Sequence, residues 1–555
     1  MKLGPRITIA IAFCLASMPF ALPAQELPDR FVWVFGWNLQ QDSDVDQITR
    51  VLDKAAKHGI NGAVMSLGLD SLSIKSADYF RRLDQVQATC RANHLELIPA
   101  VFSVGYGSSA LRFDRNLAEG LPVIDAPFLV NGGVAKLIPN PAVSIRNGDF
   151  ETYSGHRFAE WNFHDAPGEI SFADTAIKHS GNASLRFENF TSNPHGHGRV
   201  MQEVPLGPNR CYRLTVWVKT EGLAPTNSFM LQVLADDHSV APAKFEIPST
   251  GDWRKLTMVF NSLSHKSARV YAGIWGGKTG KLWLDDFSIE EIGPLNVLRR
   301  PGTPVSVKNA DGTIEYSEDK DFLRIEDPRL NAYRANGQIP DVRIPSGSRI
   351  KNGETIKVSW YHSQRVYASQ VTLCMAEPKL YEIYDREAKL LAERLHPSRV
   401  FLNADEIRLG GTCAACKGSD MAKLLGECLT KISAILRRHM PDVEIYVWSD
   451  MLDPTHNAVD NYYLVNGSFA GSWNYVPKDL VVAVWGGKPR VESMEFFSKQ
   501  GFRTLASCYY DADDLEDVAR WFELVKQTDG ARGMMYTPWE KKYELLDEFG
   551  DLIRP

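Results

Sequence analysis

The sequence lacks the features that mark several common classes of protein. It holds 62 Lys and Arg against 68 Asp and Glu, a formal net charge of −6. Because phosphate binding needs a basic surface, this balance argues against nucleic acid as the main partner. Beyond residue 22, no apolar run is long enough to cross a bilayer. A chain of 555 residues with 44% hydrophobic residues is therefore expected to form two or three soluble domains.

Cysteine is also scarce. The chain has eight cysteines, and one of them, Cys14, lies in the N-terminal apolar run. The others are odd in number and thinly spread, which argues against a disulfide framework. The one close pair, Cys413-Ala-Ala-Cys416, could form a local disulfide or, with further ligands, hold a metal. Because no second CxxC motif or His pair lies nearby, a structural pair or free thiols are favoured over a metal site.

The first 24 residues have the pattern of an export signal. Lys2 and Arg6 form a short positive region, residues 7–22 are apolar, and Pro23-Ala24 precede a polar stretch. This order predicts a signal peptide over residues 1–24 that is removed on export. We therefore expect a periplasmic or extracellular protein without stable membrane insertion, a retained anchor being the alternative.

Residues 27–140 alternate between strand-like and helix-like segments. The apolar runs 31–35, 61–66 and 95–101 are separated by helical stretches at 45–58 and 78–93. Continuous apolar strands joined by helices of this length are typical of a parallel sheet that is buried on both faces. We interpret this region as the first part of a barrel.

Residues 141–293 break this alternation. Short alternating runs and many turn residues predict an antiparallel β-sandwich. Its opening Asn147-Gly-Asp-Phe-Glu151 and its closing segment 282–289 resemble those of jelly-roll carbohydrate-binding modules. The resemblance implies a structural calcium held by Glu151 with Asp285 or Asp286, whose carboxylates are ligands that calcium prefers. Surface acids without a metal are the alternative, and both a sugar-binding and a purely structural sandwich remain open.

Residues 294–555 begin with a Pro/Gly-rich segment, 301–353, interpreted as a linker. Strand-like runs then recur, with helices between most of them, at 356–360, 400–403, 444–448, 480–485, 504–509 and 533–536. With the three strand-like runs before the sandwich they number nine, close to the eight strands of a closed barrel. The sequence therefore predicts an α/β protein, a (β/α)8 barrel interrupted by an all-β jelly-roll sandwich.

Aromatic and acidic residues recur where the predicted strands end. In such barrels the active site lies at the C-terminal ends of the strands, so these residues are expected to meet in one pocket. Tyr106 and Asn403 are two of the strand-end residues. The predicted substrate-binding residues are Trp37, His362, Trp448, Asp450, Trp485, Tyr509, Tyr510, Asp511, Trp539 and Glu540. A ring of this composition predicts a sugar pocket.

The adjacent acids Asp405 and Glu406 are the predicted catalytic residues. They leave an apolar strand and point to different sides, so they can do different jobs. Mutual repulsion and a desolvated pocket would raise one pKa towards the value that a general acid needs. Arg408, two residues later, could pair with a carboxylate or contact an acidic sugar.

The segment 378–406, with its long helix, His396-Pro397 and the strand ending in Asp405-Glu406, resembles the family 20 glycoside hydrolases, the β-N-acetylhexosaminidases. The later Trp, Tyr-to-Asp and Trp-Glu strand ends follow that family in the same order. The resemblance implies substrate-assisted retaining hydrolysis, in which the substrate's acetamido oxygen attacks the anomeric carbon. It gives Glu406 the acid/base role and Asp405 the orientation of the acetamido nitrogen.

The same resemblance implies the roles of the surrounding side chains. Tyr509 or Tyr510 would bind the acetamido oxygen, and Asp511 or Glu540 would hold sugar hydroxyls. The walls would be Trp448, Trp485 and Trp539. Two departures mark a distant relative: residues 401–404 replace the family's His-x-Gly-Gly, and residues 37–40 lack the expected Arg.

Two other functions stay open. In a retaining glycosidase on a sugar without an acetamido group, Glu406 would be the acid/base and Asp450 or Glu540 the nucleophile. A carbohydrate-binding protein without activity is the third possibility. All three functions have a glycan as partner, and none needs a cofactor for catalysis.

Overall fold

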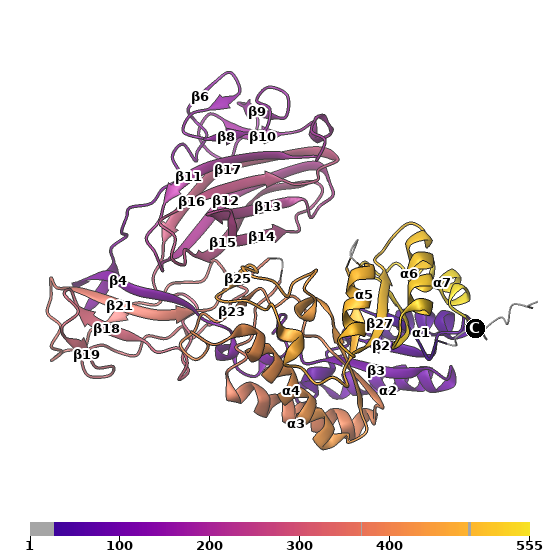
Figure 1. The fold of residues 1–555 in the computed structure, drawn as a ribbon. Helices are drawn as coiled ribbons and strands as arrows, with labels where there is room; N and C mark the ends of the chain where they lie inside the picture. The colour runs from indigo at the N-terminus through magenta and orange to yellow at the C-terminus, as the bar shows by residue number, and fades with distance from the viewer. Residues whose placement is uncertain (1–26, 368, 487–489, 555) are drawn as a thin grey trace, which may run out of the picture.

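The computed structural model describes residues 27–367, 369–486 and 490–554 (Figure 1). The predicted signal peptide, residues 1–24, lies outside these ranges. Within them, no helix combines the length and the apolar character needed to cross a membrane.

Eight strands close into a barrel in which all neighbours pair in parallel. In barrel order they are β1 (Asp29–Val34), β2 (Gly62–Met65), β3 (Glu96–Val101), β22 (Arg399–Leu402), β24 (Glu444–Trp448), β26 (Val481–Val484), β27 (Arg503–Tyr509) and β28 (Ala531–Thr537). The order around the barrel is the order along the chain. The long insertion between β3 and β22 therefore separates the third barrel strand from the fourth.

Helices cover the outside of the barrel (Figure 1). They are α1 (Asp42–Lys57), α2 (Ala77–Ala92), α3 (Pro378–Leu395), α4 (Met421–His439), α5 (Arg490–Lys499), α6 (Glu516–Gln527) and α7 (Leu546–Leu552). Each buries one apolar stripe, such as Ile48, Leu52 and Ala55 on α1. The connection from β24 to β26 instead contains two short 3-10 helices, η5 (Asp450–Leu452) and η6 (Ser472–Asn474).

Aromatic rings fill the barrel interior. Trp33, Phe401 and Trp448 pack against one another with ring centroids 4.7–5.8 Å apart. Phe35, Trp485 and Trp539 lie against this cluster and keep part of their surface exposed. Because the interior is packed with side chains, a ligand can be held only at an end of the barrel.

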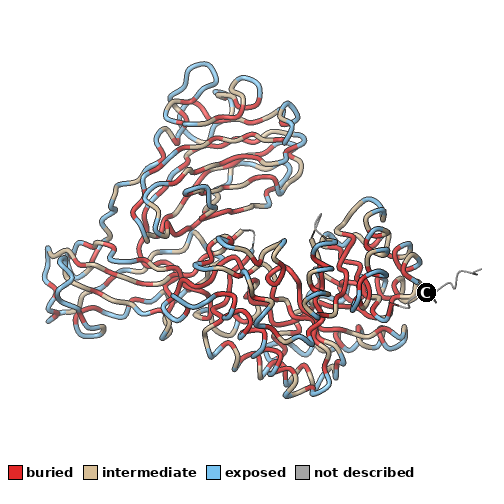
Figure 2. Tube along the Cα trace, viewed as in Figure 1, coloured by how far each residue is buried: buried red, intermediate tan, exposed pale blue. Residues whose placement is uncertain are grey.

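The inserted sandwich has two five-stranded sheets, β15-β12-β17-β10-β9 and β14-β13-β16-β11-β8. Its strands are β8 (Phe163–His164), β9 (Ser171–Asp174), β10 (Ser184–Phe187), β11 (Gly198–Pro205), β12 (Cys211–Ala224), β13 (Phe229–Ala235), β14 (His238–Phe245), β15 (Gly251–Asn261), β16 (Ser267–Ile274) and β17 (Thr279–Glu291), preceded by the hairpin β6 (Tyr153–Ser154) and β7 (Arg157–Phe158). Buried residues alternate along strands such as β13, and Figure 2 shows the buried positions between the sheets. The predicted sandwich is confirmed.

A third, six-stranded sheet was not predicted. Its order is β19-β18-β21-β4-β5-β20. The strands are β4 (Leu121–Asn131), β5 (Val134–Leu137), β18 (Ser306–Asn309), β19 (Glu315–Tyr316), β20 (Val342–Arg343) and β21 (Thr355–His362). The segment interpreted as a linker thus contributes three strands. The strand 356–360, predicted for the barrel, instead pairs antiparallel with β4 and β18, because its alternating buried and partly exposed residues suit a sheet with one covered face.

The sandwich contacts the barrel near the C-terminal ends of its strands. The short strands β23 (Leu409–Gly410) and β25 (Leu464–Val465) pair with each other beyond β22 and β24. Leu409 and Leu464 belong to the apolar core of the sandwich. The segment that carries the predicted catalytic acids is therefore anchored to the inserted domain.

Gly426 in α4 lies where the helix packs closely against Tyr475, so a larger residue does not fit there although it would favour the helix. A Cβ atom there would lie 2.2 Å from the Cβ of Tyr475, next to η6. At an exposed helix position Gly→Ala stabilises by about 1 kcal/mol, but here we expect Gly426→Ala to destabilise by about 1–3 kcal/mol through overpacking. Thermal unfolding would measure this, with Lys423→Ala on the exposed side of α4 as the neutral control. A melting temperature at or above that of the wild type would contradict the packing.

Candidate active site

Three carboxylates meet at the C-terminal ends of two neighbouring barrel strands. Asp405 and Glu406 follow β22, and Asp450 follows β24. The backbone N–H of Glu406 donates to Oδ2 of Asp450 over 2.8 Å, which joins the two strand ends. The predicted catalytic pair and one predicted binding residue therefore form one acidic cluster.

Glu406 is surrounded by hydrogen-bond donors. The Tyr106 hydroxyl donates to Oε2 over 2.5 Å, and Arg408 Nη2 donates to Oε1 over 2.6 Å. Gln370 Nε2 donates to Oε2 over 3.3 Å, and the Gln370 side-chain oxygen Oε1 accepts a hydrogen bond from Arg408. Donors of this kind, above all a guanidinium, stabilise the ionised carboxylate. Glu406 has a φ of 49°, a left-handed conformation that is uncommon for Glu.

Arg408 is buried and paired with a carboxylate, which was one of the two roles that the sequence suggested for it. Its side chain is 7% exposed and forms an ion pair with Glu406. The guanidinium carbon lies 4.8 Å from the ring centroid of Tyr367 and 5.0 Å from that of Tyr463. Two aromatic faces and a carboxylate thus fix the Arg408 side chain beside the predicted catalytic pair.

Asp405 lies in the opposite environment. Desolvation raises the pKa of its carboxyl well above the usual range, and the charges of Asp450 and Glu406 raise it further. The Asp405 carboxyl therefore keeps its proton to a higher pH than an exposed aspartate does.

Asp450 is enclosed rather than presented to a ligand. It is 0% exposed, and burial raises its pKa. Asn457 Nδ2 donates to Oδ2 over 2.7 Å, and Trp485 Nε1 lies 3.3 Å from Oδ1. These bonds hold Asp450 as a positioning group for the Glu406 backbone and the Trp485 ring.

Tryptophans border the acids. The ring centroid of Trp448 lies 6.3 Å from that of Trp485 and 6.0 Å from that of Trp539. Trp448 is 2% exposed and donates to Asn403 Oδ1 over 3.3 Å, so it forms the base of the site. Trp485 and Trp539 are partly exposed and offer faces on which a sugar ring can stack.

The end of β27 has an unusual backbone. Tyr509, Tyr510 and Asp511 have consecutive φ values of 93°, 54° and 56°. Such conformations cost energy and cluster at functional sites. The Tyr510 ring stacks on Trp485 at 6.2 Å, and its hydroxyl is buried without a partner among the described residues. The Tyr509 ring instead stacks on Tyr536 at 4.1 Å.

Asp511 shapes the neighbouring loop. Its carboxylate accepts the backbone N–H groups of Trp539, over 2.7 Å, and of Glu540, over 3.1 Å. It thus holds Trp539 in place rather than offering a free carboxylate. The Glu540 side chain is 68% exposed, with Lys542 Nζ 3.7 Å away.

Two predicted binding residues do not join this group. Trp37 stacks on Tyr543, with ring centroids 5.8 Å apart, and lies beneath the Lys541 ammonium at 4.6 Å. His362 ends β21, outside the barrel, and is 0% exposed. Its Nε2 lies 3.0 Å from Asn261 Nδ2, and burial lowers its pKa to about 4. His362 is therefore a neutral residue of β21 that packs against the sandwich, and it is not part of the strand-end site.

The acids predicted to hold calcium flank one loop of the sandwich. Glu151 Oε1 accepts the backbone N–H of Asn182 over 2.6 Å. Asp285 Oδ2 accepts the N–H of His179 over 2.8 Å, and Asp286 pairs with the His179 ring. In the described part of the chain these acids do not meet in a cluster of metal-ligand atoms.

Some functional side chains gave no signal in the sequence. Gln370 contacts Glu406 from the segment that returns from the insertion, and Asn457 contacts Asp450 from an irregular connection. Neither follows a recognisable strand. Tyr106 could be found, because it follows the third barrel strand closely.

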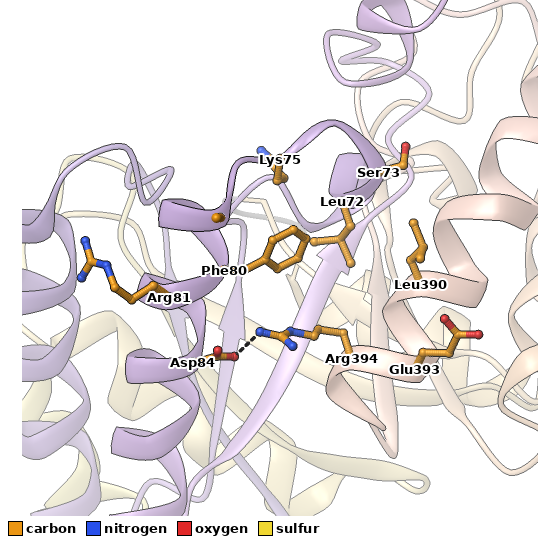
Figure 3. A pocket seen from close by; sticks show the side chains of 10 residues that line it. Leu72, Ser73, Lys75, Phe80, Arg81, Asp84, Leu390, Glu393 and Arg394 are labelled. Carbon is orange, nitrogen blue, oxygen red and sulfur yellow. Dashed lines mark hydrogen bonds and ion pairs between the residues drawn. The ribbon is translucent and has the colours of Figure 1, made fainter.

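A groove of about 780 Å³ lies away from the acids, on the outside of the barrel. Figure 3 shows Phe80 and Arg81 from α2 and Leu390, Glu393 and Arg394 from α3 at its walls. An ion pair of 2.6 Å joins Arg394 to Asp84 across it. Since it holds none of the strand-end acids, the groove is separate from the candidate active site.

Comparison with known protein families finds no match for this sequence. Comparison with curated proteins finds no relative either. Among solved structures, a CBM61 module in complex with β-1,4-galactotriose is 19% identical, with a TM-score of 0.21, over 26% of this chain and 96% of that one.

Two further structural neighbours have a similar extent of match. A family 16 carbohydrate-binding module is 18% identical, with a TM-score of 0.21, over 26% of this chain and 99% of that one. The CBM22-1 xylan-binding domain of Paenibacillus barcinonensis Xyn10C is 15% identical, with a TM-score of 0.20, over 27% and 92%. These neighbours are carbohydrate-binding modules, and each matches about a quarter of this chain.

Proposed function

We propose that the protein is an exported glycoside hydrolase whose active site lies at the C-terminal ends of the barrel strands. The observation that carries this proposal is the contrast between Asp405 and Glu406. One carboxyl is desolvated and has a raised pKa, and the other is held by three donors. Adjacent acids with opposite environments supply both a proton donor and an anion, the pair that glycoside hydrolysis needs.

The barrel supports this location. We assign it to the (β/α)8 type, in which active sites form at the C-terminal ends of the strands. Trp485 and Trp539 border the acids there and fit the apolar face of a sugar ring.

The proposed substrate is a β-linked N-acetylhexosamine sugar, cleaved from the end of a glycan. The likeness of residues 378–406 to family 20 supports an acetamido group as the internal nucleophile. Glu406, as the anion, would accept the acetamido N–H and stabilise the positive oxazolinium, and the buried Tyr510 hydroxyl would donate to the acetamido oxygen.

Asp405 would be the general acid. It would protonate the leaving glycosidic oxygen while the acetamido oxygen attacks the anomeric carbon. Its carboxylate would then take a proton from the water that opens the oxazolinium, which restores the starting state. This division of roles reverses the one implied by family 20, because Glu406 is paired with Arg408 while the raised pKa belongs to Asp405.

Hydrolysis of chromogenic β-glycosides with and without the 2-acetamido group tests the proposal. Turnover confined to the acetamido substrates is the expected result. Turnover of plain hexosides would instead favour a carboxylate of the protein as the nucleophile. The two candidates for that role are poorly placed, since Asp450 is enclosed and Glu540 faces solvent. Binding without any turnover would favour the second candidate, a carbohydrate-binding protein, to which the neutralising Glu406–Arg408 ion pair points.

A further inference from the structure

Four side chains with metal-binding chemistry, none of them a strand-end acid, meet in the interior. They are Glu119, Cys374, Cys413 and Cys416, and all four are buried. Each contributes one ligand atom, and these atoms all lie within 4.8 Å of one another. The sequence showed only the CxxC pair, because Glu119 and Cys374 are hundreds of residues apart and meet only through the fold.

The spacing of the ligand atoms matches a tetrahedral site. Cys374 Sγ lies 3.6 Å from Cys413 Sγ and 3.4 Å from Cys416 Sγ. Glu119 Oε2 lies 3.6 Å from Cys413 Sγ and 3.5 Å from Cys416 Sγ. Zinc bonds of about 2.3 Å to sulfur and 2.0 Å to oxygen give tetrahedral edges of about 3.8 Å and 3.5 Å. The four atoms thus surround a space that fits one zinc ion.

A disulfide does not account for this arrangement. The sulfur–sulfur distances exceed the roughly 2.05 Å of a disulfide bond, and Cys374 is equally placed towards both partners. Three thiols cannot all pair with one another. Glu119 would in addition be left as a buried carboxylate beside sulfur atoms, which is costly without a cation.

The surroundings orient the glutamate as a ligand. Its Oε1 accepts the N–H groups of Thr412, over 3.0 Å, and Cys413, over 2.8 Å, and the Thr412 hydroxyl over 3.1 Å. These bonds leave Oε2 directed at the sulfur atoms. Outer bonds that fix a ligand in this way are typical of built metal sites.

Arg300 adds a balancing charge. Its guanidinium lies beside Cys413, Cys374 and Glu119, and its Nε and Nη2 donate to the backbone carbonyls of Asn116 and Ala118. Three thiolates and one carboxylate carry two more negative charges than a zinc ion neutralises. A fixed, nearly buried arginine lowers the cost of that excess.

We propose that Glu119, Cys374, Cys413 and Cys416 bind one structural zinc ion. Thiolate-rich ligands select zinc over calcium or magnesium, and four protein ligands leave no open position for substrate. The ion would join three segments: the chain leaving the barrel before β4, the chain returning before α3, and the loop that follows Arg408. It would therefore fix the position of the insertion relative to the segment that carries the strand-end acids. The site does not depend on the proposed function.

Metal analysis of the full-length protein, purified without added metal, tests this directly. We expect about one zinc per chain, and less than about one-tenth of that in Cys374→Ser. Cys90→Ala removes a buried cysteine outside the cluster and should keep its zinc. A wild-type protein without zinc, in which a disulfide links Cys374 to Cys413 or Cys416, would overturn the proposal.

Cobalt substitution tests the wild type even where the variant does not fold. Chelation should release the zinc and lower the melting temperature. Cobalt added to the metal-free protein should then give intense visible bands and a thiolate-to-cobalt charge-transfer band in the near ultraviolet, as expected for tetrahedral sulfur-rich ligation. The weak spectrum of octahedral cobalt, or no binding, would contradict a Cys3Glu site.

Discussion

Glu406→Gln is expected to lower kcat/KM for glycoside hydrolysis by about 10²–10⁴-fold. The amide keeps the shape of the side chain but loses the charge that three donors stabilise. Its NH2 group would also face Arg408 or Tyr106, so one donor would lose its acceptor. Because Glu406 supplies the anion in our assignment, the loss should be equally large for good and poor leaving groups.

Steady-state rates on the same glycosides would measure this effect. Glu393→Gln, an exposed residue on α3, is the matched control and should keep wild-type rates. The melting temperature of Glu406→Gln shows whether the fold is retained. A folded Glu406→Gln with rates within about tenfold of the wild type would exclude Glu406 from catalysis.

The rate loss caused by Asp405→Asn is expected to depend on the leaving group, which distinguishes the role of Asp405 from that of Glu406. As the proton donor, Asp405 matters most when the leaving oxygen is basic. We therefore expect a loss of about 10²–10⁴-fold on a sugar leaving group and a much smaller one on a dinitrophenolate, which departs without a proton. If Glu406→Gln rather than Asp405→Asn spares the activated substrate, the roles implied by family 20 hold instead.

The wild-type pH profile follows from the same assignment. The pKa of Asp405 is raised, so its acid form persists above the usual carboxyl range. Activity should fall as the pH rises through this pKa, and Asp405→Asn should lose that limb of the profile. An unchanged alkaline limb in the variant would assign it to another group.

Asp405→Asn should also change stability, independently of any substrate. The folded state holds the Asp405 proton to a higher pH than the unfolded chain does, so this residue costs stability as the pH rises above about 4. We expect the variant to be about 1–2 kcal/mol more stable than the wild type near pH 7. Below about pH 4, where both states bind the proton, the difference should vanish. Thermal unfolding of the variant and the wild type, near pH 7 and below about pH 4, measures this difference in stability.

The sequence predicted the elements whose signal is local. The apolar strands around Trp33 and Phe401 and the alternating strands of the sandwich appear where expected. The third sheet was missed because its strands come from both sides of the sandwich, and the pairing of β4 with β21 is invisible in either segment alone. His362 was misplaced for the same reason, since its strand was counted into the barrel.

The candidate site was predictable where a residue ends a barrel strand. Asp405, Glu406, Asp450, Trp448 and Trp485 meet as expected. The contacts that give Asp405 and Glu406 different surroundings, and hence different proposed roles, were not predictable. Gln370 and Arg408 reach Glu406 through the returning chain and a turn, and these positions depend on the packing of the insertion against the barrel.

The most direct test of the catalytic assignment is a crystal structure of Glu406→Gln soaked with a disaccharide that ends in β-linked N-acetylhexosamine. We expect the terminal sugar on Trp485 and Trp539, with its glycosidic oxygen within hydrogen-bond reach of Asp405 and its acetamido group beside residue 406. A sugar bound to the sandwich alone, with the strand ends of the barrel empty, would contradict the catalytic assignment and identify the chain as a carbohydrate-binding protein.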